Sequence, residues 1–184
     1  QLQWFIAGCK EDGQRPADLS VRDEDTRRKV ELYQLYEAQC QREGVVDFGE
    51  LMLRSYELLR DNAHVRELHM TSGHNPKLKV EYFEDLFRKI KARFPAIHLK
   101  VFTMIEMDYY ARISGLSTEA FLDRCLAAGL ESCPGGGAEI FDEALREQIC
   151  IGKKDAQVWL DTAALCHRKG VPTNCTMLYG HVET

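Results

Sequence analysis

The sequence lacks most of the patterns that identify common metal-binding, membrane or nucleotide-binding proteins. None of its seven cysteines is separated from another by only two or three residues, which excludes zinc ribbons, redox dithiols and iron–sulfur triplets. No run approaches the roughly 20 apolar residues of a membrane-spanning helix, and no cleavable signal pattern opens the chain. A Walker loop, a Gly-x-Gly-x-x-Gly fingerprint, a His-Glu-x-x-His helix and a serine-hydrolase elbow are all absent. We therefore expect no membrane association, no metal site and no catalytic residue set of these classes.

An excess of positive charge is also missing. The chain has 24 Lys and Arg against 29 Asp and Glu, a net charge of -5. Residues 1–67 contain ten basic and fourteen acidic side chains, a net of -4, and residues 68–184 contain fourteen and fifteen, a net of -1. Because neither part carries the positive field that attracts phosphate backbones, we expect weak DNA binding or none.

The composition that is present describes a globular protein. The chain has 184 residues, 45% of them hydrophobic and 29% charged, enough for one large domain or two small ones. The odd number and irregular spacing of the cysteines indicate buried free thiols in a cytoplasmic protein. The chain begins without Met and ends soon after the last expected strand, so we expect it to be a piece of a longer polypeptide.

Helical periodicity alone runs through the first third of the chain. Apolar residues recur at helical spacing from Leu2, and a long helix is predicted from about Asp23 to Gly44, a residue that tolerates a left-handed C-cap. Asp47 followed by Glu50 forms the pattern of a capping box for a third helix. We predict a small all-helical domain over residues 1–66.

Strands alternate with helices from residue 67 onward. We predict strands at 68–71, 97–103, 130–133 and 171–177, and helices near 80–93, 107–114, 118–128 and 142–149, with a last helix capped by Asp155. Strand starts 30–40 residues apart are the spacing of right-handed βαβ units. The predicted fold class is α/β: the helical domain is followed by a partial, half-size parallel βα barrel of TIM type with about four strands, over residues 67–184.

Polar and glycine residues follow each predicted strand. In α/β folds the functional site lies at the carboxyl ends of the strands. Those ends carry Ser72, Gly73, His74 and Asn75; then Thr103 with Glu106; then Gly135, Gly136, Gly137, Ala138 and Glu139; then Asn174, Thr176, Tyr179 and His181. Three glycines allow a backbone to approach a ligand closely, and glutamate or histidine can supply an acid, a base or a hydrogen bond. The glycine run is alternatively a flexible connection, and His181 is either a ligand contact or part of a solvated tail.

Five blocks of the second part of the chain are specific enough to compare with known families: Glu67–Pro76, Glu81–Leu86, His98–Thr103, Gly129–Glu139 and Pro172–Glu183. On these blocks, residues of about 67–184 continuously resemble aminofutalosine synthase, a radical S-adenosylmethionine (SAM) enzyme of menaquinone biosynthesis. This resemblance implies a TIM-type barrel whose enzyme joins a SAM-derived adenosyl radical to a carboxyvinyloxybenzoate.

The resemblance also assigns roles to the strand-end residues. It implies SAM binding by Ser72, Gly73, Glu106, Gly135, Gly136, Gly137 and Glu139, and substrate contact by His74, Asn174, Thr176, Tyr179 and His181. The family binds a [4Fe-4S] cluster through a Cys-x-x-x-Cys-x-x-Cys loop, and this spacing occurs nowhere in the 184 residues. We therefore expect no bound cofactor and no complete catalysis from this chain alone, and we assign no catalytic residue.

Three blocks of the first part, residues 1–6, 32–44 and 45–54, point to a different family. On these blocks the chain, up to about residue 67, resembles the 1B subdomain of UvrD-type DNA helicases. In that family the helical insert touches DNA, but the ATP-binding motifs lie outside it. The two resemblances meet near 65–68, which indicates a chimera of two fragments.

Three functional hypotheses follow from this organisation. The chain is an incomplete radical-SAM enzyme, a DNA-binding accessory fragment of a helicase, or a recombined structural fold. A half barrel exposes strand edges and apolar faces, so for the third hypothesis we expect self-association, as a homodimer through the exposed barrel edges.

Overall fold

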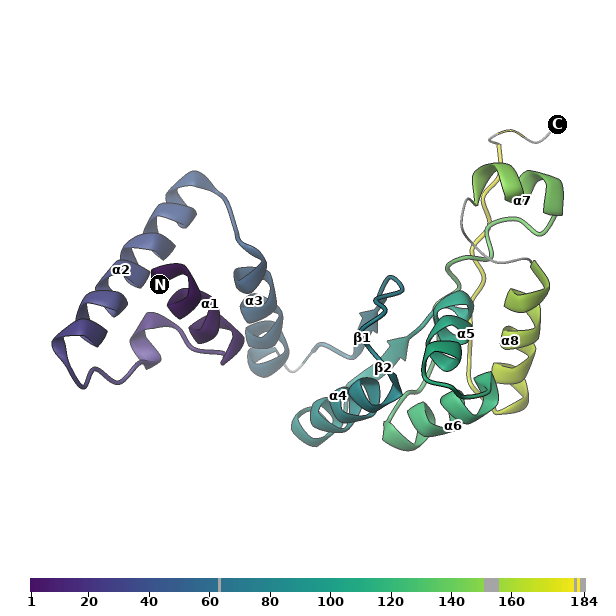
Figure 1. Ribbon diagram of the computed structural model, residues 1–184, viewed down its shortest axis with the longest axis horizontal. Coiled ribbons are helices and arrows are strands. Elements are labelled where there is room, and N and C mark those ends of the chain that lie inside the picture. Colours follow the sequence, from purple (N-terminus) through teal and green to yellow (C-terminus); the bar gives the residue numbers. More distant parts are fainter. Residues whose placement is uncertain (63, 151–155, 181, 183–184) are drawn as a thin grey trace. The chain divides into compact units, whose positions relative to one another are not determined.

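The computed structural model describes residues 1–62, 64–150, 156–180 and 182 (Figure 1). The structure is mixed α/β and mostly helical, with one two-stranded parallel sheet in the described part. The chain divides into two compact units, 1–65 and 66–184, and each is described by itself. In chain order the elements are α1 (Leu2–Glu11), a 3-10 turn (Pro16–Asp18), α2 (Glu24–Glu43), α3 (Phe48–Asp61), β1 (Glu67–Met70), α4 (Val80–Arg93), β2 (His98–Val101), α5 (Met104–Ile113), α6 (Thr118–Ala128), α7 (Glu143–Ile149) and α8 (Ala156–Arg168).

Helix α2 begins and ends, and helix α3 begins, at the positions predicted from the sequence. The Asp23 carboxylate accepts a hydrogen bond from the Thr26 amide at the start of α2, and Gly44 ends that helix in the left-handed conformation. Asp47 accepts a hydrogen bond from the Glu50 amide at the start of α3. The Glu50 side chain, however, is directed away from the cap, because it pairs with basic side chains of the unit.

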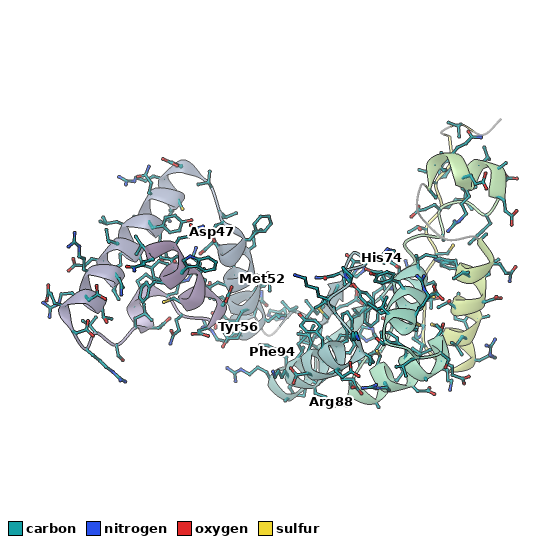
Figure 2. All side chains as sticks on the ribbon, in the orientation of Figure 1. Asp47, Met52, Tyr56, His74, Arg88 and Phe94 are labelled. Atoms are coloured by element: carbon teal, nitrogen blue, oxygen red, sulfur yellow. The ribbon has the colours of Figure 1, made fainter. Side chains whose placement is uncertain are left out.

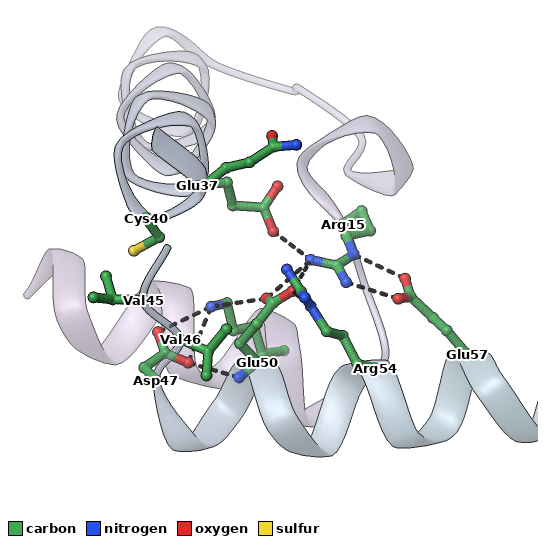
Figure 3. Close-up of a pocket in the computed structure, with 11 residues that line it drawn as sticks. Arg15, Glu37, Cys40, Val45, Val46, Asp47, Glu50, Arg54 and Glu57 are labelled. Atoms are coloured by element: carbon green, nitrogen blue, oxygen red, sulfur yellow. Dashed lines mark hydrogen bonds and ion pairs between the residues drawn. The ribbon is translucent and has the colours of Figure 1, made fainter. Parts of the chain in front are cut away.

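A small apolar core and a set of ion pairs hold these three helices together. Ile6, Cys9 and Tyr33 are buried in the core. Beside it, Arg15 lies between carboxylates from two helices, 2.7 Å from Glu37 and 2.7 Å from Glu57 (Figure 3). Apolar packing and ion pairs between helices thus both contribute to the unit.

The sheet of the second unit pairs β1 with β2 in parallel, with Leu68 opposite Leu99 and Met70 opposite Val101. One face of β2 is buried, since Leu99 and Val101 are almost fully covered. An aromatic cluster on the same side includes Phe83 of α4, whose ring centroid lies 4.7 Å from those of Phe102 and Tyr110. The helix predicted over 80–93 has these bounds in the structure, and its apolar residues face the core as expected.

The four predicted strands are reduced to two strands and two isolated bridges. Ser132 bridges to Lys100 of β2, and Cys133 bridges to Thr173, both in the parallel sense. Pro134 and Pro172 flank these bridges and have no amide hydrogen to donate, so a longer ladder is not supported at either position. The structure therefore does not show the predicted strands 130–133 and 171–177 or a four-stranded half barrel.

The remaining helices match their predicted positions with small differences. Helix α5 begins at Met104, three residues before the predicted start, because Thr103 caps it. The predicted cap Asp155 lies outside the described residues. None of the helices in the described part of the chain combines the length and apolarity needed to cross a bilayer.

Candidate ligand pocket at the strand ends

A pocket of about 320 Å³ lies beyond the carboxyl ends of β1 and β2. Three segments far apart in the sequence surround it: the 71–76 loop after β1, the first turn of α5, and a glycine-rich segment, residues 134–140, which we call the glycine loop. The lining residues are Thr71, Gly73, His74, Thr103, Ile105, Glu106, Gly136, Gly137 and Glu139. The pocket thus occupies the position at which α/β folds bind ligands.

Backbone strain concentrates around this pocket. The three non-glycine residues with positive φ in the described part of the chain are His74 (57°), Phe102 (62°) and Glu139 (49°). Each of them follows one of the parallel segments. Non-glycine residues rarely adopt this conformation, and they cluster at functional sites, where packing enforces it. The ring of His74, labelled in Figure 2, stacks on Tyr109 at a centroid distance of 4.6 Å.

The Glu106 carboxylate binds the backbone of the pocket's own loops. One of its oxygens, Oε1, accepts hydrogen bonds from the amides of Ser72 (2.6 Å) and Gly73 (2.9 Å) and from the Ser72 hydroxyl (3.2 Å). The other, Oε2, accepts from the Thr103 amide at 2.9 Å and completes a capping box. Burial raises the pKa of this carboxyl, but the amide hydrogen bonds outweigh burial and leave the pKa below its ordinary value. Glu106 is therefore ionised at neutral pH.

The glycine loop is packed too closely to accept side chains. A Cβ on Gly135 would lie 2.2 Å from the Asn174 carbonyl oxygen, and one on Gly136 would lie 3.0 Å from the Thr103 methyl group. Gly137 has φ +88°, a conformation that side chains disfavour. The hypothesis of a merely flexible connection is thus disfavoured, because the segment is in contact on several sides.

The predicted site residues divide into those that line the pocket and those that do not. Gly73, His74, Glu106, Gly136, Gly137 and Glu139 line it. Ser72 and Gly135 lie behind the wall: Ser72 bonds to Glu106, and the Gly135 carbonyl accepts from the Thr176 hydroxyl at 2.9 Å. Their proposed contacts with SAM stay predictions.

Of the four predicted substrate-facing residues near the C-terminus, the three that the structure describes, Asn174, Thr176 and Tyr179, do not line this pocket. Asn174 lines a separate cavity of about 260 Å³ on the polar face of the sheet, with His98 and Lys100 among its neighbours. Thr176 is bonded to Gly135, and Tyr179 is 79% exposed. His181 lies outside the described residues.

Thr71, Ile105 and Arg146 were not predicted from the sequence, and Thr103 was placed at a strand end without an assigned role. Thr71, Thr103 and Ile105 line the pocket, and the Thr-x-x-Glu spacing of Thr103 and Glu106, typical of a capping box, is a signal for the role of Thr103. Arg146 of α7 is 3% exposed and donates hydrogen bonds to three carbonyls of the glycine loop. Its role depends on tertiary contacts that no local pattern shows.

The first unit contains a larger cavity, of about 470 Å³, but its charged walls are paired with one another (Figure 3). Lys10 lies 2.9 Å from Asp47 and 3.1 Å from Glu50, and Arg15 lies 2.9 Å from Glu50. These charged groups are paired within the unit, so we assign them a structural role rather than a ligand-binding role. The strand-end pocket is therefore the candidate site.

Comparison with known proteins finds different families along the two parts of the chain. Residues 1–74 match the family model for the UvrD/REP helicase N-terminal domain. The rest is similar to aminodeoxyfutalosine synthase. The chain is similar to two different families. The pattern is that of a chimera, with a helicase-like segment followed by a synthase-like segment.

The synthase-like segment has several curated relatives. Aminodeoxyfutalosine synthase of Thermus thermophilus is 43% identical over 118 residues, which are 64% of this chain and 32% of that protein. The Streptomyces coelicolor protein of the same name is 42% identical over 123 residues, 67% of this chain and 32% of that protein. A 5-amino-6-(D-ribitylamino)uracil–L-tyrosine 4-hydroxyphenyl transferase of Methanothermobacter thermautotrophicus is 42% identical over 118 residues, with coverage of 64% and 32%. The chain spans about a third of the length of these relatives.

Proposed function

We propose that the synthase-like segment, residues 66–184, is part of a radical-SAM βα barrel and binds SAM in the strand-end pocket without cleaving it. Similarity to aminodeoxyfutalosine synthases supports the ligand class. The bridges from Lys100 to Ser132 and from Cys133 to Thr173 support the barrel, since they continue the parallel order of β1 and β2.

The observation that carries the proposal is the charge of the pocket. Among the residues that the structure describes, its lining contains two carboxylates, those of Glu106 and Glu139, and neither lysine nor arginine, so the lining is acidic. SAM carries a sulfonium and an ammonium group against one carboxylate, so its net charge is positive. Opposite charges attract most strongly where water is partly excluded. The pocket therefore favours SAM over its neutral thioether product, S-adenosylhomocysteine.

The shape of the pocket agrees with a ligand held against backbone. Gly136 and Gly137 form one wall of the pocket beside the side chains of Thr103 and Ile105. A Cβ added to Gly136 would lie 3.0 Å from the Thr103 methyl carbon, and one added to Gly137 would lie 3.1 Å from Cγ1 of Ile105. Because glycine has no side chain, a ligand can approach the backbone closely along this wall. In this proposal Thr71, His74 and Glu139 surround the bound SAM.

The donor set of the chain does not fit a [4Fe-4S] cluster. In the ranges that the structure describes, no three His, Cys, Asp or Glu side chains converge on a point that could hold a metal ion. Nor do the seven cysteines have the spacing of a cluster loop. We propose binding of SAM by these residues, and no reaction of it.

A titration tests the proposal. Trp159 packs behind the glycine loop and donates a hydrogen bond to the Gly136 carbonyl at 3.3 Å, so its fluorescence should report on ligand binding. SAM is expected to bind with one-to-one stoichiometry and about tenfold or more tightly than S-adenosylhomocysteine, because only SAM gains the added charge attraction. Glu139→Gln should reduce this preference. Glu147→Gln, which removes the same charge from an exposed position of α7, should not.

Three results would contradict the proposal. Equal affinity for the two compounds would refute the charge argument, and absence of binding to the folded chain would refute the pocket. After anaerobic treatment with iron and sulfide, we expect no 5′-deoxyadenosine. A stoichiometric cluster with turnover would disprove the inactivity.

The helicase-like segment carries the second candidate function, contact with DNA, on the strength of its match to the helicase N-terminal domain. We propose that this contact is weak, because Lys10 and Arg15 are paired with carboxylates. Fluorescence anisotropy with a tailed duplex should show little salt-sensitive binding, and strong salt-sensitive binding would contradict this.

Self-association is proposed for the sheet edge. Within the part of the chain that the structure describes, β1 pairs with β2 along one edge and with no other strand. An unpaired strand edge is a template for a second copy. Light scattering should show a dimer, and a monomer at high concentration would contradict this.

A further inference from the structure

Each of the two loops that form the strand-end pocket is held by one buried charged side chain. The 71–76 loop directs amide N–H groups toward a carboxylate, and the glycine loop directs carbonyls toward a guanidinium. The charge in each case matches the backbone groups that face it: hydrogen-bond donors surround the anion, and acceptors surround the cation.

The anionic contact is made by Glu106 from the first turn of α5. Its side chain is 5% exposed and accepts the amides of Ser72, Gly73 and Thr103. Tyr110, two thirds of the way along the same helix, adds a second contact: its hydroxyl accepts from the Asn75 amide at 2.9 Å. Helix α5 therefore binds the loop at two points. The Ser72 and Gly73 amides donate to Glu106 and are directed toward the helix.

The cationic contact is made by Arg146 from α7. Its Nη1 donates to the carbonyls of Ala138 (2.6 Å) and Ile140 (2.8 Å), and its Nη2 donates to the Gly137 carbonyl (2.6 Å). Arginine suits this role because its planar donors are fixed in one fork and it stays charged when buried. A lysine would present a point charge with a different geometry.

We propose that Glu106 and Arg146 are positioning residues, which fix the two loops of the pocket in a binding-competent shape before any ligand arrives. Glu106 then acts through the loop rather than by contact with the ligand. The consequence for SAM affinity rests on the proposed function, whereas the positioning itself is a property of the free protein. Preorganisation of this kind raises affinity because the loops lose less conformational entropy when the ligand binds.

Amide hydrogen exchange in the free protein tests the positioning. In Glu106→Gln, the Ser72 and Gly73 amides should exchange about tenfold faster or more, the equivalent of one lost charge-assisted hydrogen bond. Glu119→Gln is the matched control, since Glu119 pairs with Lys169 on the surface. Unchanged exchange at both amides in a folded Glu106→Gln variant would overturn the role of Glu106.

A second variant and its control test the role of Arg146 at the glycine loop. In Arg146→Gln, the Ala138 amide, bonded to the Gly135 carbonyl, and the Leu178 amide, bonded to the Glu139 carbonyl at 2.8 Å, should exchange about tenfold faster or more. Arg124→Gln is the control, because Arg124 pairs with Glu81 and Glu84 at a more exposed position. Exchange equal to that of the control would overturn the role of Arg146.

A further test uses the unmutated protein, so its outcome does not depend on whether a substituted protein folds. If Glu106 accepts the Ser72 and Gly73 amides, their proton chemical shifts should follow a single titration step below the ordinary glutamate pKa of about 4.3. Absence of such a step would overturn the contact. The Arg146 contact should appear as guanidinium protons that exchange slowly with solvent, and rapid exchange would overturn it.

A SAM titration separates this proposal from the proposed function. If the unmutated protein binds SAM, both positioning variants should weaken binding by about tenfold or more while their controls do not. If the unmutated protein binds no SAM but the exchange effects appear, the proposed function fails and the positioning stands. If SAM binds and the variants bind it equally well, preorganisation is refuted.

Discussion

Substitution of Gly135 by alanine is the sharpest perturbation that the structure offers. A Cβ at this position would lie 2.2 Å from the Asn174 carbonyl oxygen, 2.4 Å from its carbonyl carbon and 2.7 Å from the Cys175 Cα. All three are backbone atoms and cannot move aside as a side-chain tip can. Overpacking costs about 1–3 kcal/mol, and this geometry places the cost near about 3 kcal/mol. The 174–176 segment must separate from the glycine loop.

The assay is thermal unfolding followed by Trp159 fluorescence. Trp159 is nearly buried against the glycine loop, whereas the other tryptophan, Trp4, is 82% exposed and contributes little change. For a unit of this size, about 1 kcal/mol shifts Tm by roughly 3–6 °C, so Gly135→Ala should lower it by about 10–15 °C.

A matched variant controls for the loss of glycine itself. Gly136→Ala places its Cβ 3.0 Å from a methyl group of Thr103, which can yield, so its effect should be well below that of Gly135→Ala. A Gly135→Ala protein that melts within about 2 °C of the unmutated chain would refute the reasoning, since this is less than the shift expected from even 1 kcal/mol.

Three further predictions concern stability. Burial raises the pKa of Glu50, yet hydrogen bonds from three basic side chains outweigh it and leave the pKa below its ordinary value. Its contribution is therefore present at neutral pH and lost as pH falls below about 4, and a helical circular dichroism signal unaffected by acid would contradict this. Tyr110→Phe removes a bond from the Asn75 amide and should cost about 1–3 kcal/mol by urea denaturation, where an unchanged midpoint would count against the contact. Gly8→Ala in α1, where the Cβ meets nothing within 4 Å, should stabilise the first unit by about 0.5–1 kcal/mol, and any destabilisation would show that the space is filled.

Local chemistry predicted the helices well. The caps Asp23 and Asp47 and the left-handed Gly44 fix three helix ends in the structure, and all three can be read from neighbouring residues. The strands after residue 130 were predicted less well, because a ladder depends on partners far away in the sequence. Apolar spacing at 130–133 indicated a strand without showing that Pro172 would limit its pairing.

The candidate site was predictable as a location and less so as a set of roles. Strand-end position selected seven of the residues that line the pocket, Thr103 among them. It did not show that Glu106 turns its carboxylate to backbone amides, although the Thr103-x-x-Glu106 spacing was a usable signal. Arg146 could not be found from sequence, since an arginine on a short helix ordinarily faces water, and its burial follows from the carbonyls of the glycine loop.

The most direct test of the account is the thermal melt of the whole chain, followed by Trp159 fluorescence, with saturating SAM and with S-adenosylhomocysteine. A ligand that binds only the folded state raises Tm with its concentration. The account predicts a single cooperative transition of the synthase-like unit, raised clearly by SAM and less by S-adenosylhomocysteine. A cooperative transition that neither compound shifts would contradict the assignment of the strand-end pocket to SAM.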